Sequence, residues 1–446
     1  MSRKFLFISL PLIFVFILTF THELNAQTYN WHPLEAEGNA TERHENALVK
    51  AGNKIILIGG RGLKAIDIYD TQAKEWTEGT QPPFEIHHIQ VVELDGLVYV
   101  VGAMTGGWPY ETSLSHILIY DPVLDEWAIG PEIPAERRRG GAGAVVYNDK
   151  IYLVCGIING HTSGWVNWFD EFNPKTNEWR KLPNAPRARD HLHAAVADNK
   201  LVVAGGRRSG YEGGGFETTV KQTNVYDFET GEWTELSSPE GDIPTERAGI
   251  AAAVHNGHVL IIGGESGIQQ TAHNEVEILD LSTETWESLP SLQRGRHGTQ
   301  AIYFDNMIVT GAGSGDRGGG PELTSFEIFS SEENPDIPDN PLTKAELTIT
   351  SEKIVFSENS SGSQELTLSS QNGNQASLIE YIQLDNTSDF TINLPMKTPF
   401  VLTPGHQIPI EITRNSSSTG SSEATLFVKS LGGSEPLTVT ISVADQ

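Results

Sequence analysis

Tryptophan recurs along this chain at an almost constant interval, and this interval constrains the fold more than any other feature. Five of the nine tryptophans follow one another at spacings of 51, 52, 54 and 53 residues: Trp76, Trp127, Trp179, Trp233 and Trp286. Each closes a segment in which an aromatic residue or Leu, then Asp or Asn, precedes a turn and Glu-Trp or Thr-Trp. A period of about 50 residues indicates an array of one repeated supersecondary unit.

A second landmark lies upstream of each tryptophan. It is an apolar run of strand length closed by small residues, as in Ile55–Gly60, Leu201–Gly206 and Val259–Gly264. Less regular copies are 98–103, 151–156 and 307–312, which end in Gly102-Ala103, Cys155-Gly156 and Gly311-Ala312. Such runs predict strands buried on both faces. A short polar turn and another apolar strand come before each run, so every repeat is predicted to hold four strands.

The sixth copy lacks its own tryptophan. Residues 326–329 match the third strand of the repeat, but no Trp follows them. The missing residue is Trp31, because Asn30–Leu34 reads like Trp286–Pro290. The N-terminal strand is therefore expected to complete the last sheet and to leave no free sheet edge in the array.

The combined Gly-Gly, Tyr-Asp and Trp pattern resembles the kelch repeat, also found in the central domain of galactose oxidase, and the resemblance covers about residues 29–330. It implies an all-β fold: a six-bladed kelch-type β-propeller over residues 27–331, closed by the N-terminal strand. The copies ending in Gly-Ala and Cys-Gly depart from the family pattern.

The rest of the chain predicts a second β domain. A Pro- and Asp-rich linker is expected at 332–344. Residues 345–446 alternate between apolar and polar positions and contain seven or eight short strand candidates, which favour an Ig-like β-sandwich. This region resembles the ASH/MSP-like bacterial surface modules, and the resemblance implies a spacer or docking role.

Residues 1–26 have the pattern of a secretory signal peptide, with a basic start, a 16-residue apolar run and a small residue before Gln27. The run is shorter than the ~20 residues of a membrane span, which favours cleavage over an uncleaved anchor. We therefore expect a secreted or periplasmic protein.

Cys155 is the single cysteine, so no internal disulfide can form. The formal net charge of −28 argues against nucleic acid and anionic membranes as partners.

The longest loops of the repeats are expected on one face of the propeller. They join the second strand to the third, and function on such scaffolds usually lies in loops. Aromatic residues outside the repeat pattern occur in these loops or, for Trp168, at the start of the third strand. They are candidates for stacking on a sugar ring or on a partner's side chains: Trp108, Tyr110, Trp165, Trp168, Tyr211 and Phe216. The alternative is that they pack their own loops.

Arginine recurs where each repeat enters its first strand. The residues are Arg43, Arg139, Arg189, Arg247 and Arg296, with Ile86 at the second copy. Guanidinium groups near one axis predict a site for a carboxylate, whereas the kelch resemblance implies that these arginines bond to backbone carbonyls. Other candidate ligand-binding residues lie in the loops or beside the ring: His88, Arg138, His191, Arg207, Arg208, Glu265 and Arg317.

Three enzymatic interpretations remain beside simple binding. Six-bladed kelch proteins include sialic acid mutarotases, and the resemblance implies an acid–base pair, for which Glu45, Glu265, His88 and His191 are available. A galactose-oxidase-like copper enzyme does not agree with the position of Cys155 or with six repeats. A metal hydrolase is suggested by His191-Leu192-His193 and by His87-His88, but no third ligand is fixed by spacing.

The sequence thus predicts an exported binding protein that recognises a carbohydrate or a protein partner on its long-loop face. The alternative is a periplasmic mutarotase or epimerase acting on an acidic sugar such as sialic acid. No catalytic residue, metal ligand or cofactor is assigned at this point, and the oligomeric state is open.

Overall fold

The computed structural model describes residues 29–210, 215–357, 362–415 and 422–444. The predicted signal peptide and Tyr211 lie outside the described residues. The described chain is all-β, with one 3₁₀ turn, Ala135–Arg137, as its helical element. No helix in this part of the chain is both long and apolar enough to cross a membrane.

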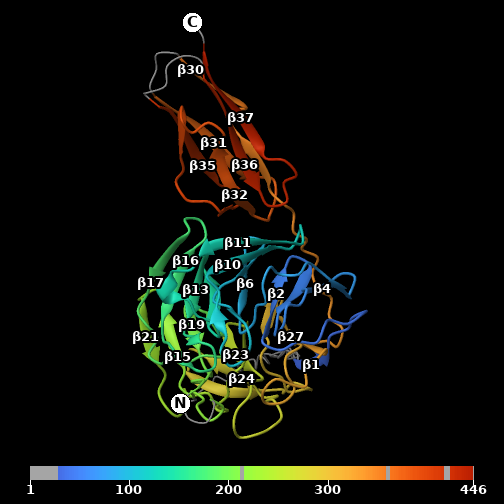
Figure 1. The fold of residues 1–446 in the computed structure, drawn as a ribbon. Coiled ribbons are helices and arrows are strands. Elements are labelled where there is room, and N and C mark those ends of the chain that lie inside the picture. The colour runs from blue at the N-terminus through green and yellow to red at the C-terminus, as the bar shows by residue number, and fades with distance from the viewer. Residues whose placement is uncertain (1–28, 211–214, 358–361, 416–421, 445–446) are drawn as a thin grey trace, which may run out of the picture.

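Six four-stranded antiparallel sheets make up residues 30–330 (Figure 1). The first three are β2–β5 (Asn46–Ala51, Lys54–Gly59, Asp67–Asp70, Glu75–Glu78), β6-β7-β10-β11 (Val91–Leu94, Leu97–Val100, His116–Asp121, Glu126–Glu132) and β12-β13-β16-β17 (Gly143–Tyr147, Lys150–Val154, Phe169–Asn173, Glu178–Lys181). The others are β18–β21 (Ala194–Ala197, Lys200–Val203, Asn224–Asp227, Glu232–Glu235), β22–β25 (Ala251–His255, His258–Ile262, Val276–Asp280, Thr285–Leu289) and β26-β27-β28-β1 (Ala301–Phe304, Met307–Gly311, Phe326–Ser330, Asn30–Pro33). The sixth sheet takes its outer strand from the N-terminus, as the sequence predicts.

The first strands of the six sheets contact one another in cyclic order. β2, β6, β12, β18, β22 and β26 each touch the next strand of this series, and β26 touches β2 again. Two long loops add small hairpins of their own: β8-β9 (Met104–Thr105, Thr112–Ser113) and β14-β15 (Ile157–Asn159, Ser163–Trp165).

The tryptophan period has a direct structural cause. In every sheet the Trp of the outer strand stands opposite the aromatic residue or Leu of the neighbouring strand, in register: Tyr69–Trp76, Tyr120–Trp127, Phe172–Trp179, Tyr226–Trp233, Leu279–Trp286 and Phe329–Trp31. Cross-strand aromatic pairs of this kind stabilise a sheet. The landmark residues therefore mark one recurring pair, and Trp31 occupies its position in the sixth sheet.

Two further sheets form the C-terminal unit. One contains β29 (Glu346–Ile349), β31 (Ser363–Gln371), β35 (Gln407–Arg414) and β33 (Phe390–Asn393); the other contains β30 (Lys353–Ser357), β37 (Leu437–Ala444), β36 (Glu423–Ser430), β32 (Ser377–Leu384) and β34 (Phe400–Leu402). Apolar residues from both sheets share one core. The nine strands exceed the seven or eight expected, because the short β34 was not recognised in the sequence.

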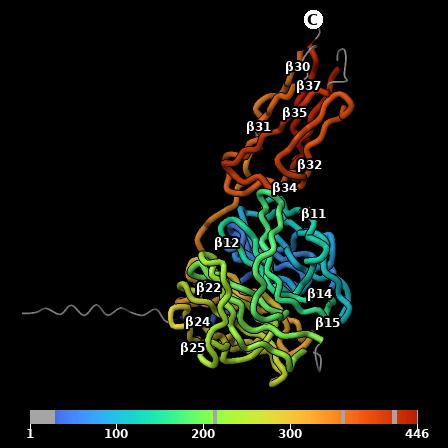
Figure 2. The backbone as a smooth tube through the Cα atoms, turned by 90° about the vertical axis from the view of Figure 1, so that its left-hand side faces the viewer, coloured from blue at the N-terminus to red at the C-terminus, as the bar shows by residue number. Residues whose placement is uncertain are grey.

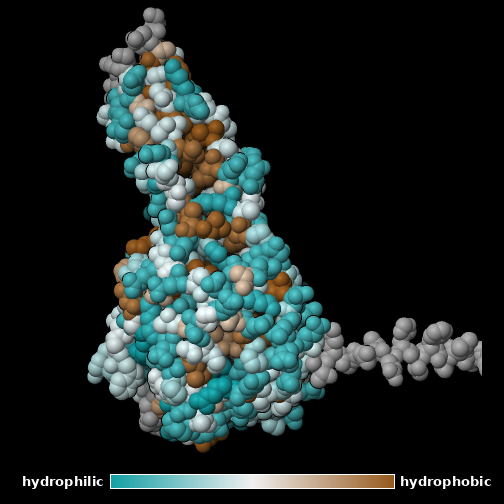
Figure 3. Space-filling model, turned by 90° about the vertical axis from the view of Figure 1, so that its right-hand side faces the viewer, coloured by the Kyte–Doolittle hydropathy of each residue, from teal (hydrophilic) through white to brown (hydrophobic). Residues whose placement is uncertain are grey.

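The C-terminal unit packs on the short-turn end of the six-sheet body (Figures 1 and 2). Leu378, Val401 and Leu431 join a core that includes Leu94 and Leu97 of the second sheet. The buried Gln375 side chain donates to the carbonyl of Gly96 and to the Asp121 carboxylate. The space-filling view shows apolar residues at the narrow junction of the two units (Figure 3). The long loops are left at the opposite end of the body.

Candidate functional site

A ring of backbone hydrogen bonds surrounds the axis of the six sheets. One residue precedes the first strand of each sheet, and we call these six residues the axial ring: Glu45, His88, Gly141, His191, Gly249 and Gly298. From His88 onward, the amide of each ring residue donates to the carbonyl of the ring residue before it, at 2.7–3.0 Å. The ring returns to its start through the amide of Asn46, which follows Glu45 and donates to the carbonyl of Gly298 at 3.1 Å. All six have φ between 53° and 62°.

Three members of the axial ring are not glycine. A positive φ is tolerated by glycine and costs energy for other residues, and such strain often occurs at functional sites. Gly141, Gly249 and Gly298 satisfy this geometry, whereas Glu45, His88 and His191 adopt it while carrying polar side chains. Because these side chains are almost fully buried at the axis, the structure singles out one side of the ring as chemically distinct.

A cavity of about 420 Å³ opens above the axial ring at the long-loop end. We call it the axial cavity; its lining includes His44, Glu45, Arg61, Trp108, His161, Arg207, Phe216, Glu265 and His297. A smaller pocket below it is lined by Glu45, His88 and His191 together with the three glycines of the ring. Glu45 therefore faces both spaces, and the volume of the upper one falls in the range of small-molecule sites.

The arginines of the axial cavity are held by carboxylates. Arg207 donates to Glu265 at 2.6 Å and Arg61 donates to Glu111 at 2.7 Å. Burial opposes ionisation of Glu265, but His297 and Arg207 outweigh it and lower the pKa of its carboxyl group. In the same way, hydrogen bonds from His161 and Arg61 outweigh burial and lower the pKa of Glu111. The charges of these two arginines are therefore balanced by carboxylates, and the arginines give the cavity no net positive charge.

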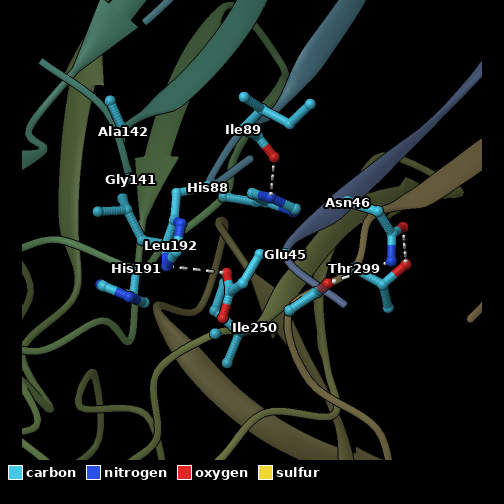
Figure 4. A pocket seen from close by; sticks show the side chains of 13 residues that line it. Glu45, Asn46, His88, Ile89, Gly141, Ala142, His191, Leu192, Ile250 and Thr299 are labelled. Atoms are coloured by element: carbon cyan, nitrogen blue, oxygen red, sulfur yellow. Dashed lines mark hydrogen bonds and ion pairs between the residues drawn. The ribbon is translucent and has the colours of Figure 1, made fainter. Parts of the chain in front are cut away.

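Three histidines lie together beneath the axial cavity. The rings of His88, His161 and His191 are mutually edge-to-face, with centroids 4.8–4.9 Å apart. His88 also faces the Glu45 carboxylate, with 3.5 Å between Nε2 and Oε2 (Figure 4). Burial lowers the pKa of His88, and the neighbouring histidines and Arg61 lower it further. Burial and Arg207 lower the pKa of His191 and outweigh the opposing effect of the Asp190 carboxylate. Both rings are therefore neutral at physiological pH.

The arginine ring predicted from the sequence lies inside the sheets and outside the axial cavity. Arg43, Arg139, Arg189, Arg247 and Arg296 are at most 1% exposed. The guanidinium group of each donates to the carbonyl 16 residues further on, in its own sheet. Arg43, Arg139, Arg247 and Arg296 also pair with buried carboxylates. The prediction that these five residues bind a ligand is not supported by their placement, since their donors are engaged within the fold.

The remaining predicted residues divide between the cavity and the outer surface. Trp108, Arg207 and Glu265 line the cavity, and the Arg317 guanidinium lies 5.3 Å from the ring of Phe216, which also lines it. Trp165 and Arg208 line a separate hollow with Arg187 and Glu235. Arg138 pairs with Glu132, and Tyr110 is 78% exposed without lining the cavity. The guanidinium groups of Arg137 and Arg139 lie 4.3 and 5.6 Å from the ring of Trp168, so Trp168 packs against the segment that enters β12.

Two details of the sequence interpretation are wrong. The sixth small-residue pair is Ala312-Gly313, because Arg296 donates to Ala312 and the Gly313 amide donates to Arg43, as in the other copies. His191 and His193 do not share a strand face, because His191 precedes β18 with φ 53°. The Nε2 of His193 lies 3.0 Å from the carbonyl of Ile89, away from the cluster.

Sequence reasoning missed Arg61, Glu111, His161 and Asp190. One signal was available for Arg61: it directly follows Gly59-Gly60, as Arg207 follows Gly205-Gly206 and Glu265 follows Gly263-Gly264. All three residues line the axial cavity. The backbone of each pairs with the residue that precedes a member of the axial ring: Arg61 with His44, Arg207 with Asp190 and Glu265 with Ala248. No repeat signal marks His161, which belongs to the turn of the β14-β15 hairpin.

Comparisons with known proteins agree with this architecture. Residues 18–271 match the family model "Attractin/LZTR1 beta-propeller". The chain is 27% identical over 331 residues to "Kelch-like protein terF" of Aspergillus terreus, which covers 70% of this chain and 69% of that protein. It is 28% identical over 299 residues to "Kelch-like protein 23" of Homo sapiens, covering 62% of this chain and 50% of that protein. The chain thus spans half the length of this human relative.

A solved structure shows the same fold. The protein described as "Structure of YjhT" aligns with a TM-score of 0.55 at 16% identity, over 65% of this chain and 96% of that chain. Fold, sheets and matches together define a kelch-type β-propeller protein. Because the family model covers more than half of its length, the chain belongs to the Attractin/LZTR1 beta-propeller family.

Proposed function

We propose that residues 27–331 form a six-bladed propeller closed by β1 and that residues 345–446 form an Ig-like sandwich, joined by a linker at 332–344. Three observations support the closed arrangement. There are six sheets, their first strands contact one another in cyclic order, and the hydrogen bond from Asn46 to Gly298 brings the axial ring back to its start. The shared core of the two C-terminal sheets supports the sandwich. The signal-like segment at 1–26 supports export to the periplasm or the cell exterior.

We infer that the protein binds a carbohydrate in the axial cavity. The observation that carries this proposal is the lining of the cavity. Trp108 offers an exposed aromatic face beside Phe216, whose ring packs against the guanidinium groups of Arg207 and Arg317. Arg61, Arg207 and Glu265 offer charged donors and acceptors held in place by ion pairs. Sugars present both hydroxyl groups and apolar ring faces, so such a lining suits them. Because the arginines are neutralised, we expect a neutral sugar to bind better than an acidic one.

The Trp108→Ala variant tests this proposal. Trp108 is 70% exposed at the cavity, so a sugar stacked on it would bury apolar surface that the free protein leaves in water. Loss of that contact is expected to weaken binding about 10-fold, or about 1.4 kcal/mol. The measurement is calorimetric titration with the sugars that raise the thermal midpoint of the wild-type protein.

The Tyr110→Ala variant is the matched control, because Tyr110 belongs to the same loop, is similarly exposed and does not line the cavity. It should bind sugar like the wild-type protein. If the Trp108→Ala variant binds the sugar as tightly as the wild-type protein does, the sugar does not bind in the axial cavity. If no sugar binds the wild-type protein, the exposed Trp108, Tyr110 and Ile268 favour a protein partner, which is common for kelch-like propellers.

Sugar mutarotation or epimerisation is the second candidate. It is favoured by carboxylate–imidazole pairs at the axis: Glu45–His88 at 3.5 Å and Glu265–His297 at 3.4 Å. Such pairs can move a proton to and from a bound sugar. Exchange spectroscopy of sugar anomers should show faster interconversion with the wild-type protein than with the Glu265→Gln variant. Equal rates with protein and buffer, for neutral sugars and for sialic acid, would exclude this activity.

A further inference from the structure

The hydrogen bonds around His88 fix which of its nitrogens carries the proton. Nε2 of His87 lies 3.0 Å from the carbonyl of Gly106, which can only accept, so His87 is protonated at Nε2. Nδ1 of His87 must then accept from Nδ1 of His88, 2.6 Å away. The proton of neutral His88 is therefore on Nδ1, and its Nε2 carries a lone pair.

This lone pair has no hydrogen-bond donor, although the His88 side chain is 1% exposed. It faces Oε2 of Glu45 at 3.5 Å. A lone pair and a carboxylate oxygen both accept, so this arrangement is unfavourable unless a positive charge lies near them. A buried acceptor without a donor costs about 1–3 kcal/mol, and the site also has to maintain a positive φ at both residues.

The other two rings are oriented in the same way. Nδ1 of His191 contacts Oδ1 of Asp190, whose carboxylate also accepts from the Ser209 hydroxyl and amide. Nδ1 of His161 lies 3.0 Å from Oε1 of Glu111. The Nε2 atoms of His161 and His191 face each other at 3.0 Å. Nδ1 of His88 and of His191 thus has a hydrogen-bond partner, and Nδ1 of His161 has a carboxylate within ion-pair distance. This arrangement leaves the three Nε2 atoms for the interior of the cluster.

We propose that His88, His161 and His191 bind a divalent transition-metal ion, Zn²⁺ in the first instance, through their Nε2 atoms, with Glu45 beside the ion. His87, Glu111 and Asp190 act as positioning residues, because an acceptor at the outer nitrogen fixes the tautomer and orientation of a metal-binding histidine. The proposed metal site adjoins the axial cavity, but the proposal does not depend on sugar binding there.

The distances fit such an ion. One ligand nitrogen from each ring lies within 4.8 Å of the others. Tetrahedral coordination with Zn–N bonds of about 2.0–2.1 Å places nitrogens roughly 3.3 Å apart, so small side-chain rotations bring the ligands into position. Three imidazoles favour Zn²⁺ and similar ions over Mg²⁺ and Ca²⁺, which prefer oxygen ligands.

The surrounding charges also fit. Among the described residues, neither Glu45 nor Asp190 forms an ion pair with Lys or Arg; their ionic contacts are with His88 and His191. A divalent ion would supply the positive charge that this buried pair of carboxylates lacks. Glu45 and His161 also line the axial cavity, so the ion has an entry path and a coordination position open towards a ligand.

The test is zinc titration of tag-free, chelator-treated protein, with calorimetry for affinity and elemental analysis for metal per chain. We expect one Zn²⁺ per chain and a rise of the thermal midpoint with Zn²⁺ but not with Mg²⁺. Co²⁺ should give the visible absorption of a tetrahedral complex. The His161→Gln variant should bind at least 100-fold more weakly, and the Asp190→Asn variant 10- to 100-fold more weakly.

The His258→Gln variant is the matched control, because His258 begins β23 and is not a member of the cluster. It should bind zinc like the wild-type protein. His161 belongs to a loop hairpin, so its replacement should leave the metal-free thermal midpoint within a few degrees of wild type. The proposal is overturned if the wild-type protein binds no stoichiometric zinc, or if the His161→Gln and His258→Gln variants bind it equally well.

Discussion

Replacing Arg247 with methionine is expected to lower the free energy of unfolding by about 3–5 kcal/mol. The Arg247 guanidinium has no solvent exposure and donates to the Glu277 carboxylate and to the carbonyls of Gly263, Thr245 and Ile261. Methionine fills similar volume but donates nothing. The substitution therefore leaves a buried carboxylate and several carbonyls without their donor, and the measurement is urea unfolding followed by tryptophan fluorescence.

The Arg138→Met variant is the control for this prediction. Arg138 pairs with Glu132, which is 65% exposed, so losing the pair should cost no more than about 1 kcal/mol. The double variant Arg247→Met, Glu277→Gln should regain part of the lost stability, because it removes the unpaired charge. Equal unfolding midpoints for the Arg247→Met and Arg138→Met variants would show that Arg247 does not stabilise the fold. The prediction that the five arginines bind a ligand would then be favoured again.

The sequence predicted the sheets well because their landmarks record local pairing. Trp76 and Tyr69 are seven residues apart and form one cross-strand pair, so a repeated motif marks a repeated contact. The same logic located Trp31, although it lies about 300 residues from its partner Phe329. The sixth copy of the small-residue pair was misaligned because Gly311, Ala312 and Gly313 are all small, and only the hydrogen bonds of Ala312 and Gly313 in the folded chain identify the pair.

The site was less predictable, for two physical reasons. First, recurrence shows that a residue matters but not which atoms it contacts, so the arginine ring was compatible with both a ligand and the backbone. Second, His161 is outside the repeat pattern. The β14-β15 hairpin carries it to His88 and His191, which are 73 and 30 positions away in the sequence. Convergence of this kind arises from loop geometry, which a single sequence does not encode in any periodic signal.

The Trp31→Ala variant should also lose about 3–5 kcal/mol of stability, a typical cost of deleting a large buried aromatic side chain. Trp31 is 2% exposed and its ring lies 5.2 Å from that of Phe329 in the neighbouring strand β28. It also belongs to a core that contains Leu260 of the fifth sheet and Ile308 of the sixth. Thermal unfolding followed by circular dichroism measures the loss.

The His32→Ala variant is the control, because His32 is the next residue of β1 and is only half-buried. A small loss of stability in the His32→Ala variant, beside a large loss in the Trp31→Ala variant, would show that the packing of one side chain, and not the strand alone, holds the N-terminus in the sixth sheet.

Removing residues 27–34 is a stronger test of closure. The deletion exposes the edge of β28, and unpaired strand edges favour association. If β1 closes the propeller, this shortened chain should be less stable than the Trp31→Ala variant and should self-associate in size-exclusion chromatography. A shortened chain that stays monomeric with the wild-type thermal midpoint would contradict closure by the N-terminal strand.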